Sequence, residues 1–103
     1  MDFEAIPAKM LDSYIGIKNY MIIDLREEEE YRKGHIFGAY NLPYERIDRM
    51  TLRKDVTYIM YCERGSASMA AAKELSKKGY HVKSVVGGIL AYRGRNMVKS
   101  GGN

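Results

Sequence analysis

The chain has 103 residues, 46% of them hydrophobic and 29% charged, with a formal net charge of +4, one cysteine and two histidines. These values fit one small globular domain, 1–103, and exclude a disordered chain, an internal disulfide and a multi-cysteine zinc site. Because no apolar run approaches the ~18 residues of a transmembrane helix and no secretory signal opens the chain, we expect a cytoplasmic protein without a membrane partner.

The first half of the chain predicts short elements. Residues 5–14 favour a short helix, and the apolar run 20–25 is typical of a strand buried on both faces. A short helix is predicted over 26–34 and ends at Gly34. We interpret the four glutamates that open it as a solvated helix start, where the helix dipole favours negative charge, and not as a metal site. Residues 35–43 predict a loop with a brief strand.

The second half repeats the alternation. An amphipathic helix is predicted over 44–50, followed by a buried β-branched and aromatic strand over 56–62. A longer helix over 66–79 opens on small polar residues and ends in lysines and glycine. A third strand over 81–86 and a last helix over 89–97 complete the pattern. Strands and helices that alternate with short connections predict an α/β fold, in which a small, mainly parallel sheet is flanked by helices on both faces.

The single cysteine, Cys62, stands at the carboxyl end of the second long strand, where open parallel sheets bind ligands. Gly65 allows the following loop to bend with its amides pointing inward, and a helix begins directly after it. Such a loop and helix N-terminus bind anions and stabilise a thiolate. The residues leave two interpretations of Cys62, a buried apolar side chain and a nucleophile for an anionic sulfur, phosphorus or arsenic substrate.

Three segments, in this order and spacing, resemble the single-domain rhodaneses, which are sulfurtransferases with one cysteine at the head of a tight active-site loop. The segments are IDLREEEEYRKGHIFGAYNLP (23–43), YCERGSAS (61–68) and VVGGILAYRG (85–94). The resemblance covers nearly the whole chain and implies a rhodanese-like fold. It also implies that the Cys62 thiolate takes the outer sulfur of a donor such as thiosulfate as a persulfide and passes it to cyanide or a thiol.

The resemblance implies that the loop binds the donor through Glu63, Arg64, Gly65, Ser66, Ala67 and Ser68. Arg64 is the only cation in this loop and either binds the donor or is a solvated charge, and Glu63 beside it partly cancels its charge. Ala67 occupies a position at which many family members have arginine. Ser66 and Ser68 either bond the sulfur or cap the helix, and we favour capping for at least one of them.

Further residues are expected to support the loop. Asp24 ends a strand at the sheet edge of the cysteine and either orients the loop or, as we favour, pairs with Arg26 or caps a turn. His35 lies in the family's Gly-His-Ile pattern, and we interpret it as a scaffold residue and not as a general base. Gly87 and Gly88 are predicted to permit a close turn near the active-site loop.

One position in the loop, Ser68, distinguishes a sulfurtransferase from a phosphatase. Phosphatases and arsenate reductases of similar fold need an arginine six residues after the cysteine, where this chain has Ser68, so we discount phosphoryl transfer. A persulfide carrier in a sulfur relay and a non-catalytic binding module remain alternatives.

The expected partners are a small anionic sulfur donor and a thiol acceptor, for example a thioredoxin-like protein. The basic residues are too dispersed for nucleic acid, and we expect a monomer without cofactor or metal.

Overall fold

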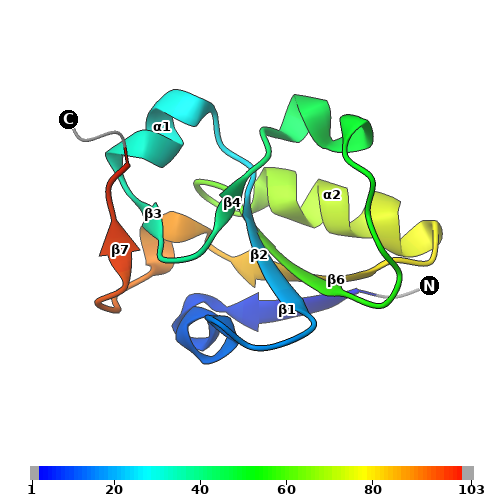
Figure 1. Ribbon diagram of the computed structural model, residues 1–103, viewed down its shortest axis with the longest axis horizontal. Helices are drawn as coiled ribbons and strands as arrows, with labels where there is room; N and C mark the ends of the chain where they lie inside the picture. Colours follow the sequence, from blue (N-terminus) through cyan, green and yellow to red (C-terminus); the bar gives the residue numbers. More distant parts are fainter. Residues whose placement is uncertain (1–2, 101–103) are drawn as a thin grey trace.

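The computed structural model describes residues 3–100 and contains one five-stranded and one two-stranded sheet (Figure 1). The strands of the larger sheet lie in the order β1-β6-β5-β2-β4, and every neighbouring pair is parallel. Their bounds are β1 Glu4–Pro7, β2 Tyr20–Asp24, β4 Tyr40–Asn41, β5 Thr57–Tyr61 and β6 His81–Val86. The small antiparallel sheet pairs β3 His35–Ile36 with β7 Met97–Val98. The predicted mainly parallel sheet is confirmed.

Helices cover both faces of the larger sheet. Two are α-helices, α1 Glu28–Lys33 and α2 Ser66–Lys77, and three are 3-10 helices, η1 Ala8–Tyr14, η2 Tyr44–Arg49 and η3 Ile89–Ala91. Side chains alternate along β5, so that Ile59 and Tyr61 pack with η1 and η3, whereas Tyr58 and Met60 pack with α2 and η2. Figure 1 shows the sheet between these two layers. Within residues 3–100 no helix is long and apolar enough to cross a membrane.

The start of the chain departs from the prediction. The helix expected from residue 5 is wrong over its first residues, because Glu4–Pro7 forms β1 and pairs with Lys83–Val86 of β6. The strand lies at the edge of the sheet, where a proline can occupy the side that needs no donor. Only from Ala8 does the chain become helical, as η1. Tertiary pairing has therefore decided a segment whose local pattern favoured a helix.

The last predicted helix, over 89–97, is also wrong beyond its first turn. Only η3 is helical, and the following residues run as a loop towards β7. The hydroxyl of Tyr92 donates to Asp12 across 2.6 Å and accepts the Asn96 N–H across 2.9 Å. These bonds fasten the loop to η1, a long-range contact that a helix in this segment would not make.

Candidate active site

Cys62 directly follows β5, and its sulfur is held by backbone amides of the next turn. The Gly65 N–H donates to Cys62 Sγ across 3.1 Å and the Ser68 N–H across 3.4 Å. Both donors lie at the start of α2, the positive end of the helix dipole. Cys62 is only 6% exposed. Inward amides together with a helix N-terminus form the kind of cup that binds anions in proteins.

The glycine pair after β6 supports the cysteine loop from the opposite side. The Ile89 N–H donates to the Cys62 carbonyl across 2.9 Å, and the Leu90 N–H donates to the Glu63 carbonyl across 3.2 Å. Gly88 has φ of 64°, and a Cβ there would lie 2.5 Å from the Cys62 carbonyl oxygen. The close turn predicted near the active-site loop is therefore present, and it depends on the missing side chain.

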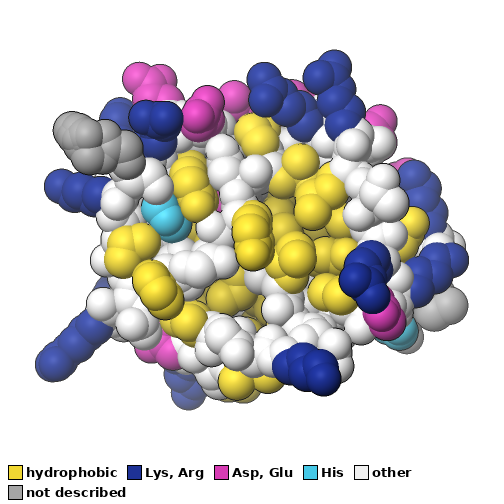
Figure 2. Space-filling model, in the orientation of Figure 1, with side chains coloured by type: hydrophobic (Ala, Val, Ile, Leu, Met, Phe, Trp, Pro, Cys, Tyr) yellow, Lys and Arg dark blue, Asp and Glu magenta, His cyan; other side chains and the backbone are white. Residues whose placement is uncertain are grey.

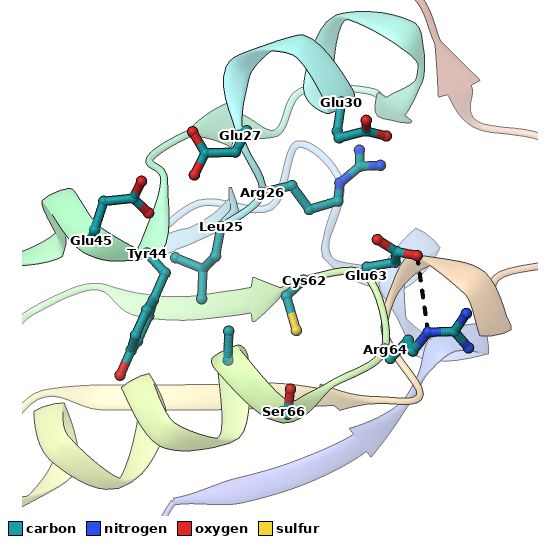
Figure 3. A pocket seen from close by; sticks show the side chains of 11 residues that line it. Leu25, Arg26, Glu27, Glu30, Tyr44, Glu45, Cys62, Glu63, Arg64 and Ser66 are labelled. Atoms are coloured by element: carbon teal, nitrogen blue, oxygen red, sulfur yellow. Dashed lines mark ion pairs between the residues drawn. The ribbon is translucent and has the colours of Figure 1, made fainter.

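Cys62 lines an open pocket of about 420 Å³. Leu25, Tyr44 and Ala67 supply apolar lining. Figure 3 shows the cysteine side chain pointing towards the first turn of α2, while side chains from the chain after β2 and from η2 stand across the pocket. The charged side chains that line it are Arg26, Arg64, Glu27, Glu30, Glu45 and Glu63. The pocket thus joins a sulfur in an amide cup to a strongly charged opening.

The loop residues predicted to bind a donor differ in where their side chains lie. Glu63, Arg64, Ser66 and Ala67 line the pocket, whereas Gly65 contributes its amide. Arg64 Nε lies 3.9 Å from Glu63 Oε2, and both side chains are mostly exposed. Figure 3 shows the Arg64 guanidinium extending away from the Cys62 sulfur. In this arrangement the only cation of the loop pairs with its acidic neighbour and does not reach the sulfur.

The serines do not cap α2 with their side chains, and that prediction is wrong. The N-cap residue is Gly65, which forms no side-chain capping bond. Ser68 is buried, and its Oγ donates to the Gly65 carbonyl across 3.2 Å and pairs with Ser84 Oγ across 2.8 Å. Ser84 was not predicted, although the period of two along β6 places it with Val82 on the face towards α2. The two serines therefore link the start of α2 to β6 behind the cysteine loop.

Asp24 and Arg26 form the ion pair that was favoured for them. Arg26 Nη2 lies 2.7 Å from Asp24 Oδ2 and Arg26 Nε lies 3.0 Å from Asp24 Oδ1, and the aspartate side chain is fully buried. Burial lowers the pKa of Arg26, but its bonds and attraction to Asp24 outweigh this, so the pKa is raised overall. Arg26 also donates to the Gly34 carbonyl, and Asn41 donates to the Arg26 carbonyl. The pair fixes the chain where it leaves β2 for the pocket.

Tyr61 and His35 belong to the scaffold behind this ion pair. The buried Tyr61 hydroxyl accepts the Ile36 N–H across 3.1 Å. Burial raises the pKa of Tyr61 above its ordinary value, and the negative charge of Asp24 raises it further. The His35 ring stacks on Tyr31 with centroids 3.8 Å apart, and its Nδ1 bonds the Tyr31 carbonyl across 2.8 Å. His35 does not line the pocket, and these contacts are those of a scaffold residue.

The glutamates after β2 were assigned to solvent, yet two of them reach the pocket. Glu27 is the N-cap of α1, and Glu30 lies in its first turn. Their position in the sequence could have indicated this, because they closely follow β2. The carboxyl ends of β2 and β5 lie at the same edge of the parallel sheet, so residues after β2 come close to Cys62 after β5. The hydrogen bond between the Glu27 and Glu45 side chains raises the pKa of Glu27, and their charge repulsion adds to it. Among the residues described, no three acidic, histidine or cysteine side chains are grouped as metal ligands.

Known proteins share this architecture. The family model of the rhodanese-like domain matches residues 7–95, and the chain belongs to this family. A tRNA sulfurtransferase of Desulfurococcus amylolyticus is 36% identical over 92 residues, which are 87% of this chain but 18% of that protein. The thiosulfate sulfurtransferase GlpE of Shewanella oneidensis is 29% identical over 97 residues, 91% of this chain and 96% of that protein.

A solved structure agrees with the fold. The rhodanese-like domain protein of Staphylococcus aureus superposes with a TM-score of 0.84 at 24% identity, over 96% of this chain and 100% of that one. At this identity the match concerns the fold alone. The names of the sequence relatives support a sulfurtransferase role at the level of the family, and the resemblance inferred from the three motifs is confirmed.

Proposed function

We propose that the protein transfers sulfane sulfur through a persulfide on Cys62, taking the sulfur from a donor such as thiosulfate and giving it to cyanide or a thiol. The observation that supports this most is the position of Cys62 Sγ, which accepts two backbone N–H groups and lines an open pocket. A sulfurtransferase needs such a sulfur, stabilised as an anion and reachable by a small donor. The thiosulfate sulfurtransferase among the relatives, similar over nearly the full length, supports the choice of donor.

The chemistry is a double displacement. The Cys62 thiolate attacks the outer sulfur of thiosulfate, the sulfur–sulfur bond of the donor breaks, and sulfite leaves with the electron pair. The amides of Gly65 and Ser68 stabilise the charge on Sγ before attack, and they need not move to do so. In the second step the acceptor attacks the outer sulfur of the persulfide, and the thiolate of Cys62 is released. A sulfur relay uses the same two steps with a protein as donor.

Phosphoryl transfer fits the site less well. The position where phosphatases of this fold type need arginine is Ser68, which is buried and bonded to Ser84 beneath the loop. No guanidinium can clamp a phosphoryl group from there. Arg26, the other arginine that lines the pocket besides Arg64, is held by Asp24.

Steady-state formation of thiocyanate from thiosulfate and cyanide tests the proposal. A double displacement gives parallel lines when reciprocal rate is plotted against reciprocal thiosulfate at several cyanide concentrations. Cys62→Ser should form no thiocyanate above the rate in buffer. The outcome against the proposal is an unchanged rate in Cys62→Ser, or turnover of p-nitrophenyl phosphate with no transfer of sulfur.

Arg64→Gln separates the two interpretations of that residue. If its guanidinium turns towards a bound donor, the KM for thiosulfate rises severalfold while kcat stays the same, because uniform binding is lost. If Arg64 stays with Glu63, as the structure has it, both constants remain within about twofold, since exposed pairs contribute little.

A further inference from the structure

The pocket in front of Cys62 is bordered by carboxylates from three parts of the chain. We call Glu27, Glu30, Glu45 and Glu63 the acidic rim. They come from the start of α1, from η2 and from the cysteine loop itself. Figure 3 shows Glu27, Glu30 and Glu45 on the side of the pocket opposite the first turn of α2, and Glu63 on the loop that leads into α2. These carboxylates and Cys62 line the same pocket, so their negative charge acts on any molecule that enters the pocket to react with the sulfur.

Carboxylates outnumber cations in the lining of the pocket, although Arg64 and Glu63 partly cancel each other. The two guanidinium groups of the pocket are engaged, Arg26 by the buried Asp24 and Arg64 by Glu63. Glu30 pairs only loosely with a lysine outside the pocket, at 3.7 Å. Among the described residues, Glu27 and Glu45 form no ion pair, and the interaction between their carboxyl groups raises the pKa of Glu27. The positive charge of nearby Arg46 partly offsets this effect on Glu27.

Apolar side chains lie beside the cysteine loop as well. Leu90 is 48% exposed, and its N–H bonds the Glu63 carbonyl. Met69 is 42% exposed, and its N–H bonds the Gly65 carbonyl. Figure 2 shows apolar side chains over the middle of the face drawn and charged ones around its edge. Exposed apolar side chains combined with unpaired charge are features of a protein-binding surface.

We propose that the sulfur acceptor is a protein cysteine flanked by lysine or arginine residues, which dock on the acidic rim. The inference rests on the proposed function and names the acceptor class for it. The partner's thiolate attacks the outer sulfur of the Cys62 persulfide and forms a new sulfur–sulfur bond. The bond to Cys62 breaks, its electron pair leaves as the Cys62 thiolate, and the persulfide proton stays on the sulfur that moves.

Two physical arguments select a basic partner. Lysine or arginine beside a cysteine keeps that cysteine as the attacking thiolate and also complements the carboxylates of the rim. An acidic thiol or an RNA strand would bring negative charge against the excess of carboxylates in the pocket, which slows encounter and weakens docking. The rim therefore selects acceptors by charge before the sulfur is transferred.

The test uses three peptides that each contain one cysteine, flanked by four lysines, four glutamines or four glutamates. The protein is loaded with sulfur from thiosulfate or inorganic polysulfide and freed of donor, and the loss of persulfide to each peptide is followed by intact mass in a single turnover. The lysine peptide should react at least ~10-fold faster than the glutamate peptide at low ionic strength, and high salt should reduce this ratio.

Matched variants separate docking from the reactivity of the peptides themselves. Glu27→Gln/Glu45→Gln removes two charges of the acidic rim, and the lysine-to-glutamate rate ratio should fall at least ~3-fold. Glu29→Gln/Glu74→Gln removes two exposed charges that do not line the pocket and should keep the ratio. An equal ratio in the two double variants overturns the acceptor proposal while thiocyanate formation still stands. A protein that takes sulfur from no donor overturns both.

Discussion

The Gly65 amide donates to the Cys62 sulfur across 3.1 Å, in a turn where Gly65 has φ of 110°. An L side chain rarely adopts this conformation, and a Cβ at Gly65 would also lie 3.1 Å from the Gly87 amide nitrogen. The amide cup thus depends on two glycine-containing turns that contact each other. It follows that small backbone changes here should affect the chemistry more than the fold.

Gly65→Ala should lower kcat/KM for thiosulfate by about 10- to 100-fold, because the displaced turn no longer aims its amide at the sulfur. Thiocyanate formation measures this loss. Gly16→Ala is the control, since Gly16 also has positive φ, at 73°, but nothing lies within 4 Å of its Cβ position. Both variants should unfold at lower urea, and only Gly65→Ala should lose activity. Equal loss of activity in both would show that the amide of Gly65 has no special part.

Asp24→Asn should destabilise the protein by about 3 kcal/mol, because it leaves the largely buried Arg26 without its counter-charge. Urea unfolding measures this change. Asp55→Asn is a matched control, since Arg53 and Asp55 form the same two-point pair at 2.7 Å with both side chains mostly exposed. The control should leave the unfolding midpoint nearly unchanged. Similar shifts in the two variants would mean that burial of the Asp24 pair is not what stabilises this end of β2.

Stability should fall at alkaline pH through Tyr61. Its folded pKa lies above the ordinary value of 10.0, so above that pH the unfolded chain releases a proton that the folded chain keeps. The unfolded state then binds fewer protons, and the free energy of unfolding decreases by up to about 1.4 kcal/mol per pH unit for this group. Tyr61→Phe should unfold more easily at pH 8 but show a shallower decline between pH 10 and 11.5. If the free energy of unfolding falls equally steeply with pH in the wild type and in Tyr61→Phe, Tyr61 does not have this role.

The parts of the site that could be predicted are those fixed by local chemistry. A cysteine after a buried strand, a glycine three residues later and a helix start define the amide cup, because each follows from its neighbours in the chain. The pairing of Asp24 with Arg26 could be expected for the same reason, since the two residues stand only two positions apart. Such features need no knowledge of the rest of the fold.

The features that were missed depend on long-range contacts. The strand at Glu4–Pro7 exists only because β6 lies beside it, and the helix expected over 89–97 gives way to the bond between Tyr92 and Asp12. Glu27 and Glu45 are far apart in sequence and meet only where η2 approaches the start of α1. Local propensity cannot report such contacts, so the sequence predicted a solvated helix start for Glu27 but not its place at the pocket.

Small anions should respond to the acidic rim in the opposite sense to basic peptides. Glu27→Gln/Glu45→Gln should lower the KM for thiosulfate by about 2- to 5-fold with little change in kcat, because it removes repulsion felt by a dianion in the pocket. Steady-state kinetics at low ionic strength measure it, with Glu29→Gln/Glu74→Gln for comparison. A KM that is the same in both double variants would show that thiosulfate does not approach past these carboxylates.

The central claim is that Cys62 carries the sulfur, and the mass of the intact protein after incubation with thiosulfate tests it most directly. The account predicts a gain of about 32 Da, one sulfur atom, that is lost on addition of cyanide and absent in Cys62→Ser. Peptide mapping should place the added sulfur on Cys62. No gain in mass with thiosulfate, polysulfide or any other sulfane donor, or a gain that persists in Cys62→Ser, would contradict it.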